Sequence, residues 1–388
     1  MRTARKRRQL QSLYFSVAGG GAVVLLATFI GAQLLGLSSP VAPLKTQSLG
    51  SLPFQAQGPA ALAASGPIWV GAQNAALWKI APDGQATRFF ESDFGSQTAP
   101  LPFVVNGHSR VAWSTLDGKI RVFDARKNVN APLWTRDLGA PISTKMSVVN
   151  DTLLCATDAG KIAALDAQNG ATRWGTALGA PVGEALTLTT NGVLVPTLGG
   201  ARWRGGLVHL NRQNGAILWR FPENSNAHAA GVCAPFFDAS ANRVFWANDE
   251  GAVFALSAQN GEKIWKTFAV SLDAKANSTG KPVVLRGAPV LLDGTVFVGG
   301  NDGVLRAFDA QNGDLQWSAN LGAPITTPVQ SAGDLAIWAR TQTGDAFVIG
   351  RASGEILRRS RLSPSAVWNE SSGFDFSSRG ELVKLQIS

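Results

Sequence analysis

The stretch that decides the fold is Asp166-Ala-Gln-Asn-Gly-Ala-Thr-Arg-Trp174, because the chain repeats it three more times. The further copies are Asn211-Arg-Gln-Asn-Gly-Ala-Ile-Leu-Trp219, Ser257-Ala-Gln-Asn-Gly-Glu-Lys-Ile-Trp265 and Asp309-Ala-Gln-Asn-Gly-Asp-Leu-Gln-Trp317. Their tryptophans stand 45, 46 and 52 residues apart, and Trp134 stands 40 residues before Trp174. A period of this length is typical of solenoids and propellers.

One copy predicts four short strands. Apolar residues alternate with others on both sides of Gly160, which is typical of two half-buried strands in a hairpin. Asn169-Gly170 predicts the next hairpin, because Asn and Gly tolerate the positive φ of a tight turn. Four strands with a repeated turn make up one propeller blade. The turn glycines of the four clear copies are Gly170, Gly215, Gly261 and Gly313.

The number of blades follows from the glycine-centred hairpins. These hairpins recur around Asn74, Gly118, Gly160, Gly205, Gly251, Gly303, Gly344 and Gly380. The last copy stops after its third strand, whereas residues 45–53 align with the outer strand and crossover at 134–141. We expect this N-terminal segment to complete the eighth blade, so that no edge of the ring is left unpaired. The prediction is an all-β fold, an eight-bladed β-propeller of four-stranded antiparallel blades over residues 44–388, with seven blades as the alternative.

The repeat resembles that of the quinoprotein-type (PQQ-like) β-propeller family, Ala-x-Asp-x-x-x-Gly-x-x-x-Trp, which Ala164, Asp166, Gly170 and Trp174 match. The resemblance implies that the repeat tryptophans pack between neighbouring blades. They are Trp134, Trp174, Trp219, Trp265 and Trp317. Two other copies depart from the pattern, with Arg88 and Arg358 at the tryptophan position.

In overall organisation the chain is similar to the BamB-type outer-membrane assembly factors. That resemblance implies a lone eight-bladed propeller, tethered outside the cytoplasmic membrane and devoid of catalytic groups. BamB itself is a lipoprotein, and this chain has no cysteine near the end of its N-terminal apolar run.

The N-terminus predicts a membrane anchor. Residues 1–12 form a basic tail, and residues 13–37 contain no charged side chain. A helix of that length is ~37 Å long, enough to cross a bilayer. We expect an uncleaved anchor, with a cleaved signal peptide as the alternative. The basic tail keeps the N-terminus cytoplasmic, which places the linker 38–43 and the propeller in the periplasm or extracellular space.

Composition excludes several other classes. The 388 residues are 45% hydrophobic and 16% charged, which excludes disorder of the whole chain. The net charge of +9 does not indicate nucleic-acid binding, because five of the basic residues precede residue 9. The only cysteines, Cys155 and Cys233, fall in separate blades, so we expect buried thiols and no disulfide framework.

Catalytic and metal motifs are absent from the sequence. Quinone-dependent dehydrogenases of the same repeat family carry adjacent cysteines and a calcium site, and this chain has no Cys-Cys pair. Its histidines, His108, His209 and His228, are scattered, without the spacing of a zinc site. We expect no enzyme activity and no cofactor, and we expect His209, at the repeat's alanine position, to be structural.

Three irregular insertions indicate a working face. They are Gly199–Gly206, Asn224–Gly231 and Val270–Pro282, and meander geometry places all three on one rim over the fourth to sixth blades. Recognition usually resides in such loops, and neutral loop variation is the alternative. The candidate partner-binding residues are Arg202, Trp203, Arg204, His228 and Lys275.

The sequence therefore predicts a single-pass inner-membrane protein whose propeller binds a protein partner in the cell envelope. A ligand-sensing or quinone-binding propeller is the alternative. A second surface is the basic strand with Arg351, Arg358, Arg359 and Arg361, which fits either an anionic lipid surface or a solvated edge guarded against aggregation.

Overall fold

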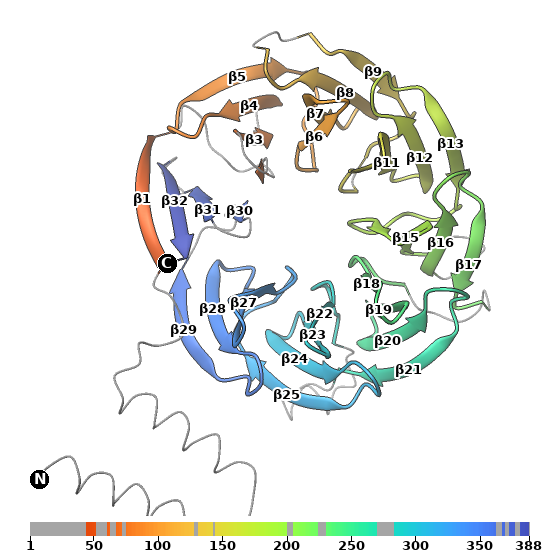
Figure 1. Ribbon diagram of the computed structural model, residues 1–388, viewed down its shortest axis with the longest axis vertical. Coiled ribbons are helices and arrows are strands. Elements are labelled where there is room, and N and C mark those ends of the chain that lie inside the picture. The colour runs from red at the N-terminus through yellow and green to blue at the C-terminus, as the bar shows by residue number, and fades with distance from the viewer. Residues whose placement is uncertain are drawn as a thin grey trace, which may run out of the picture. The chain divides into compact units, whose positions relative to one another are not determined.

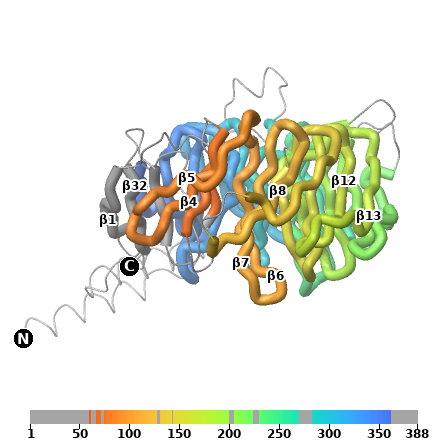
Figure 2. The backbone as a smooth tube through the Cα atoms, turned by 90° about the horizontal axis from the view of Figure 1, so that it is seen from above, coloured from red at the N-terminus to blue at the C-terminus, as the bar shows by residue number. Residues whose placement is uncertain are grey.

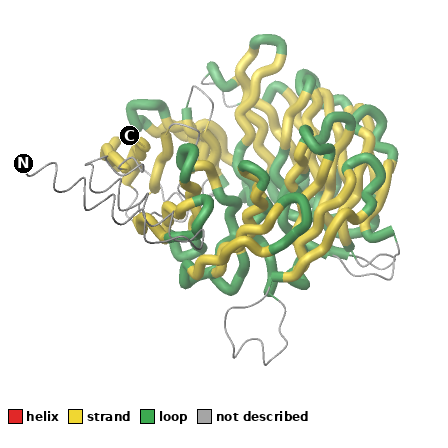
Figure 3. The backbone as a smooth tube through the Cα atoms, turned by 60° about the horizontal axis from the view of Figure 1, so that its bottom comes forward, coloured by secondary structure: helices red, strands yellow, loops and turns green. Residues whose placement is uncertain are grey.

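The structure, a computed structural model, describes residues 44–51, 60–62, 67–71, 75–127, 131–142, 144–199, 205–223, 230–269, 283–361, 367–368, 372–376 and 381–387. Its regular elements within these ranges are all β-strands, as Figure 3 shows, so the predicted all-β class is confirmed. No helix in the described part of the chain is long and apolar enough to cross a membrane. The predicted tail, anchor and linker at residues 1–43 lie outside the described residues.

The described strands form eight antiparallel sheets of four strands, of which seven are meanders and the eighth joins β1 to the edge of a three-stranded meander. The first sheet contains β2 (Ala60–Leu62), β3 (Ile68–Gly71), β4 (Ala76–Ile80) and β5 (Ala86–Glu91), and the second contains β6 (Leu101–Val105), β7 (His108–Ser114), β8 (Lys119–Asp124) and β9 (Trp134–Asp137). The third contains β10 (Ser147–Val149), β11 (Thr152–Ala156), β12 (Lys161–Asp166) and β13 (Thr172–Ala177), and the fourth contains β14 (Thr187–Leu188), β15 (Gly192–Thr197), β16 (Gly206–Asn211) and β17 (Ile217–Phe221).

The fifth sheet contains β18 (Phe236–Asp238), β19 (Arg243–Ala247), β20 (Ala252–Ser257) and β21 (Lys263–Phe268), and the sixth contains β22 (Val290–Leu292), β23 (Thr295–Gly299), β24 (Val304–Asp309) and β25 (Leu315–Asn320). The seventh contains β26 (Gln330–Ser331), β27 (Ala336–Arg340), β28 (Asp345–Gly350) and β29 (Ile356–Arg361), and the eighth contains β30 (Val367–Trp368), β31 (Ser372–Phe376), β32 (Glu381–Ile387) and β1 (Leu44–Ser51).

The sheets stand around a ring, with β5, β9, β13, β17, β21, β25, β29 and β1 on its perimeter (Figure 1). This arrangement is a β-propeller. The number of sheets equals the predicted number of blades, and it disagrees with the seven-blade alternative.

The ring closes where the two ends of the described chain meet. β1 pairs with β32 in antiparallel register, from Leu44 opposite Ile387 to Ser51 opposite Glu381. The prediction that the N-terminal segment completes the eighth blade is therefore confirmed. Closure gives β32 a partner on both sides, so the last sheet is as wide as the other seven.

The core lies between neighbouring sheets. All five residues of β11 are buried, and β12 is buried from Ile162 to Leu165, because both faces of these strands meet another sheet. In β13 the burial reads exposed, exposed, buried, exposed, intermediate, exposed, and the buried residue is Trp174. The outer strand of the third sheet therefore contributes mainly its tryptophan to the core.

The connections divide between two rims. One rim carries the turns between the second and third strands, such as 157–160 and 248–251, together with the links between sheets. We call it the connection rim. The opposite end, with turns such as 166–172, is the turn rim. The Asp158 amide donates to the Pro141 carbonyl at 2.9 Å, which joins such a turn to the link entering the same sheet. On the turn rim, the β6–β7 hairpin extends beyond the ring (Figure 2).

Candidate functional site

On the turn rim, each of the five repeat tryptophans lies against the turn glycine of the following sheet. Trp134 faces Gly170 and Trp265 faces Gly313, where a Cβ atom would lie 2.6 and 2.8 Å from the ring atom Cε3. Gly170 has φ +75° and Gly313 has φ +80°, which favour glycine. The complete pairs are Trp134–Gly170, Trp174–Gly215, Trp219–Gly261, Trp265–Gly313 and Trp317–Gly354.

Each of these indoles also donates a hydrogen bond to the turn that it covers. Trp134 Nε1 donates to the Ala167 carbonyl at 3.3 Å, and Trp265 Nε1 donates to the Ala310 carbonyl at 3.1 Å. Arg110 donates to the same Ala167 oxygen at 3.0 Å. These turn carbonyls are therefore engaged in holding one sheet to the next.

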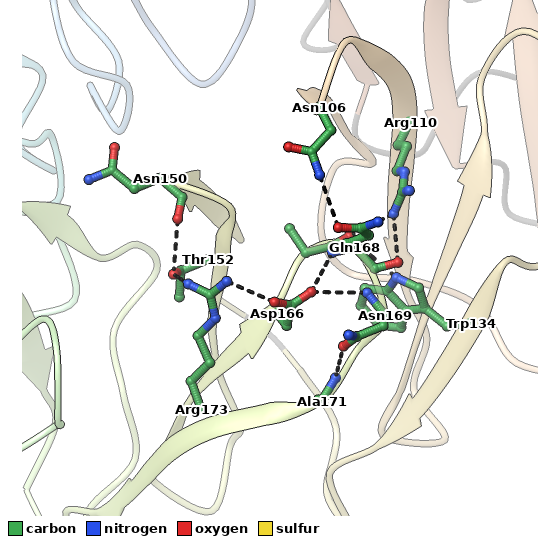
Figure 4. A network of polar contacts seen from close by, with 11 residues as sticks. Asn106, Arg110, Trp134, Asn150, Thr152, Asp166, Gln168, Asn169, Ala171 and Arg173 are labelled. Atoms are coloured by element: carbon green, nitrogen blue, oxygen red, sulfur yellow. Dashed lines mark hydrogen bonds and ion pairs between the residues drawn. The ribbon is translucent and has the colours of Figure 1, made fainter.

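Further polar contacts complete the turn between β12 and β13 (Figure 4). Asp166 Oδ1 accepts from the amides of Gln168 and Asn169 at 2.9 and 3.1 Å, and Arg173 pairs with Asp166 Oδ2 at 2.8 Å. The Arg173 hydrogen bond lowers the pKa of the Asp166 carboxyl. The Asn106 side chain donates to Gln168 at 2.9 Å, which ties the β6–β7 hairpin to this turn. These contacts make this part of the turn rim a structural surface.

The first junction, where Arg88 replaces tryptophan, is built differently. Phe89 lies edge-on to Trp69 at 4.9 Å between ring centroids and to Phe123 at 5.5 Å. Lys79 Nζ donates to the Ala125 carbonyl at 2.8 Å, and Ala125 occupies the place in its turn that Ala167 occupies in the third sheet. An aromatic cluster and an ammonium group thus replace the indole.

The described cysteines and two of the histidines show no catalytic arrangement. Burial raises the pKa of the Cys155 and Cys233 thiols to about 12, so neither forms a nucleophilic thiolate near neutral pH. His209 is buried and His108 is exposed. Among the described residues, no group of three or more His, Cys, Asp or Glu side chains could hold a metal ion.

The connection rim carries the described ends of the three insertions. A Cβ atom on Gly205 would lie 2.8 Å from the Cβ of Ala230, so the end of the first insertion lies beside the end of the second. The Asp249 amide donates to the Ala230 carbonyl at 3.0 Å, and the Ala269 amide donates to the Gly251 carbonyl at 2.7 Å. One turn, 248–251, therefore holds the end of the second insertion and the start of the third.

The side chains that were predicted to bind a partner lie outside the described residues. They are Arg202, Trp203, Arg204, His228 and Lys275. Their placement on the connection rim stays a prediction, supported by the described residues on either side of each insertion.

The structure adds charged residues on the connection rim that sequence reasoning missed. Lys145, Glu184 and Arg286 are exposed, each on a link between sheets. The Lys145 amide donates to the Glu184 carbonyl at 2.9 Å, which brings the links of the third and fourth sheets together. Partial burial raises the pKa of the Glu184 carboxyl, and the positive charge of Arg286 opposes this shift. No common spacing marks them in the sequence, since Lys145 stands four residues after Pro141 and Glu184 three residues after Pro181.

The basic strand β29 is engaged in ion pairs. Arg359 pairs with Asp345 at 3.2 Å, and the hydrogen bond from Arg359 lowers the pKa of that carboxyl. Arg351, just before the strand, pairs with Asp293. These contacts favour the solvated-edge interpretation of this surface over the lipid-binding one.

Comparison with known proteins agrees with this geometry. The family model described as "Outer membrane protein assembly factor BamB" matches residues 116–286 and again residues 204–385. The chain is 32% identical over 118 residues to the outer membrane protein assembly factor BamB of Vibrio cholerae, covering 30% of each chain. It is 26% identical over 145 residues to the dehydrogenase subunit of a quinone alcohol dehydrogenase from Gluconobacter oxydans, covering 34% of this chain and 18% of that one.

The similarity in fold extends further than the similarity in sequence. The crystal structure of BamB from Moraxella catarrhalis superposes with a TM-score of 0.63 at 16% identity, covering 88% of this chain and 98% of that one. The matched stretches span 30% to 56% of the curated BamB relatives. The likeness to the solved structure shows the fold alone.

Proposed function

Because the chain belongs to the family of the outer membrane protein assembly factor BamB, we propose that it is a non-catalytic, protein-binding scaffold of the cell envelope. Its connection rim over the fourth to sixth sheets binds the partner. Trp203, flanked by Arg202 and Arg204, is the central contact, since aromatic and arginine side chains dominate protein interfaces.

The observation that carries this proposal is the difference between the two rims. On the turn rim, tryptophan and arginine side chains occupy the repeated turns. On the connection rim, the 248–251 turn holds the end of the second insertion and the start of the third, and the first insertion ends beside the second. Lys145, Glu184 and Arg286 are exposed on links between sheets on the same rim. Variable loops on a rigid scaffold are the usual place of recognition.

The proposal includes a membrane tether. Residues 13–37 anchor the chain in the inner membrane, and the propeller lies on the far side from the cytoplasm. The tether keeps the connection rim near other envelope proteins without a lipid-modified cysteine. Fractionation of membranes before and after high-salt and alkaline washing tests this part, since an anchored chain stays in the membrane pellet.

A second candidate is a quinone-binding propeller, which the match to a quinone alcohol dehydrogenase subunit favours. That role needs residues that hold the quinone and a cation. Addition of pyrroloquinoline quinone and Ca²⁺ to the purified chain, with an alcohol and a redox dye, tests it directly. Alcohol-dependent reduction of the dye would favour this candidate over the scaffold.

Co-purification with matched variants tests the scaffold. The tagged full chain is isolated from membranes as wild type, as Trp203→Ala and as Gln213→Ala, which changes an exposed side chain on the opposite rim of the same sheet. We expect one envelope protein to accompany the wild type and Gln213→Ala, and to be lost with Trp203→Ala. The same proteins in all three samples would contradict the proposed rim.

A further inference from the structure

His209 occupies a position where the other three clear copies of the repeat carry alanine. It lies opposite Trp219 in the sheet register, as Ala164, Ala255 and Ala307 lie opposite the tryptophans of their own sheets. Its side chain is 2% exposed, and its ring centroid lies 5.1 Å from that of Trp219. A titratable group therefore lies against the tryptophan that joins the fourth sheet to the fifth.

The site suits a neutral imidazole and no other form. Among the described residues, Nε2 has a hydrogen-bond partner in Thr189 Oγ1, 2.9 Å away, and buried Nδ1 has none. A Cβ atom on Gly192 would collide with the ring, so the absence of a side chain there makes room for it. A second proton would convert both nitrogens to donors while the site offers a partner to one.

The surrounding strands offer no carboxylate to an imidazolium. β14, β15, β16 and β20 carry no charged side chain. The charged residues on the other strands of these two sheets are Arg220, Asp238, Arg243, Lys263 and Lys266. Asp238, the single acid, accepts from Ser240 at 2.6 Å in its own turn. Four of the five groups are cations, which add to the cost of a buried positive charge.

The fourth-to-fifth junction depends on the side chain that His209 touches. Trp219 Nε1 donates to the Ala258 carbonyl of the fifth sheet at 3.0 Å, and the ring lies against Gly261. A charged imidazole gains water only if the strands around it separate. We propose that His209 makes the junction between the fourth and fifth sheets acid-sensitive, so that this junction opens when the imidazole takes up a second proton.

The pH range follows from burial, which lowers the pKa of His209 from 6.5 to about 4. At pH values between these two pKa values, the imidazole binds its second proton more readily in the open junction than in the closed one. Opening therefore becomes easier as the pH falls below ~6.5, and the effect is complete below ~4. This inference does not depend on the proposed partner.

Hydrogen–deuterium exchange of the full chain at pH ~7 and pH ~5 tests the proposal. After correction for the intrinsic pH dependence of exchange, we expect opening around β16 and β17 to increase about 20-fold at the lower pH. His209→Ala introduces the alanine that the third, fifth and sixth sheets carry at this position, and it should abolish the increase. His108→Ala, which removes an exposed histidine, should leave it unchanged.

Two results would overturn the proposal. One is equal protection of β16 and β17 at both pH values in the wild type. The other is an acid response that persists in His209→Ala. Peptides from β24 and β25 serve as an internal reference, since their junction carries Ala307 at the same place. If His209→Ala does not fold, His209→Gln supplies a side chain that cannot titrate.

Discussion

Gly170 lies so close to Trp134 that a Cβ atom on the glycine would be 2.6 Å from the indole Cε3. The two residues belong to different sheets, and each of the third to sixth sheets supplies a tryptophan to the next sheet and a turn glycine to the previous one. This relationship explains the copies without tryptophan. Arg88 lies in the first sheet, and the matching segment of the second sheet, residues 125–133, contains no glycine for a tryptophan to cover. Arg358 lies in the seventh sheet, and in the eighth sheet no turn joins β32 to β1.

Replacing Gly170 with alanine should destabilise the propeller by more than the cost of placing alanine in a left-handed backbone conformation. The left-handed conformation costs an L-residue ~1–2 kcal/mol, and overpacking against the indole adds ~1–3 kcal/mol. We expect Gly170→Ala to lower the free energy of unfolding by ~3 kcal/mol, measured by denaturant titration.

Gly179 provides the matched control. Its φ is +71°, close to the +75° of Gly170, and no atom lies within 4 Å of a Cβ at that position. Gly179→Ala should therefore cost only the ~1–2 kcal/mol of the backbone term. Equal losses in the two variants would show that the tryptophan does not constrain the turn.

The repeated residues made most of the fold predictable. Asn169-Gly170 indicates its hairpin, although only the glycine of this pair has a positive φ and Asn169 instead accepts a hydrogen bond from the Ala171 amide. Residues 45–53 resemble an outer strand closely enough to predict closure. The first junction was not predictable in its details. Phe89 and Lys79 replace an indole through packing across two sheets, and no local pattern indicates this substitution.

For the candidate site, the sequence predicts a rim of the propeller and assigns no roles to residues within it. Meander geometry indicates the rim on which the insertions lie, because strand order fixes which turns share an end of the sheet. The insertions themselves carry no repeat, so periodicity assigns no roles within them. Lys145, Glu184 and Arg286 were missed because charged residues in links resemble ordinary surface residues until their neighbours are known.

Lys79 should contribute to the first junction through its hydrogen bond to Ala125. A hydrogen bond from a charged donor contributes ~1.5–3 kcal/mol, and the methionine of Lys79→Met keeps the apolar part of the side chain. We expect thermal unfolding to shift downward by an amount equivalent to ~1–2 kcal/mol. Lys161→Met, at an exposed position, should leave the midpoint nearly unchanged, and a similar shift in both variants would refute the role of Lys79.

Asp117 should stabilise the fold above acidic pH. Burial alone would raise its pKa, but hydrogen bonds from Thr115 and Arg121 outweigh burial and lower the pKa to about 2. The folded chain therefore releases this proton more readily than the unfolded chain. The resulting stabilisation, ~2 kcal/mol, is complete above pH ~4 and is lost as the pH falls through ~2.

Comparison of Asp117→Asn with the wild type by denaturant titration from pH ~7 to pH ~2 tests this. The difference in unfolding free energy should shrink across the acidic part of that range. Asp83→Asn, in an exposed Asp-Gly turn, serves as the control and should show little difference at any pH. A constant Asp117→Asn difference would contradict the assignment.

Removal of β1 should open the ring. A chain that begins at residue 52 lacks every pairing from Leu44 to Ser51, whereas one that begins at residue 44 keeps them. Since each ladder hydrogen bond contributes ~1 kcal/mol, the shorter chain should lose ~3 kcal/mol or more and associate through the free edge of β32. Calorimetry and light scattering of the two chains check this, and equal stability would show that closure through β1 is dispensable.

Site-specific photo-crosslinking in native membranes tests the central claim, that the connection rim binds a protein partner. One probe replaces Trp203, and a second replaces Asn169 on the turn rim. We predict that the first probe yields one recurrent envelope protein, identified by mass spectrometry, and that the second does not. The same adducts from both probes would contradict a binding site on the connection rim.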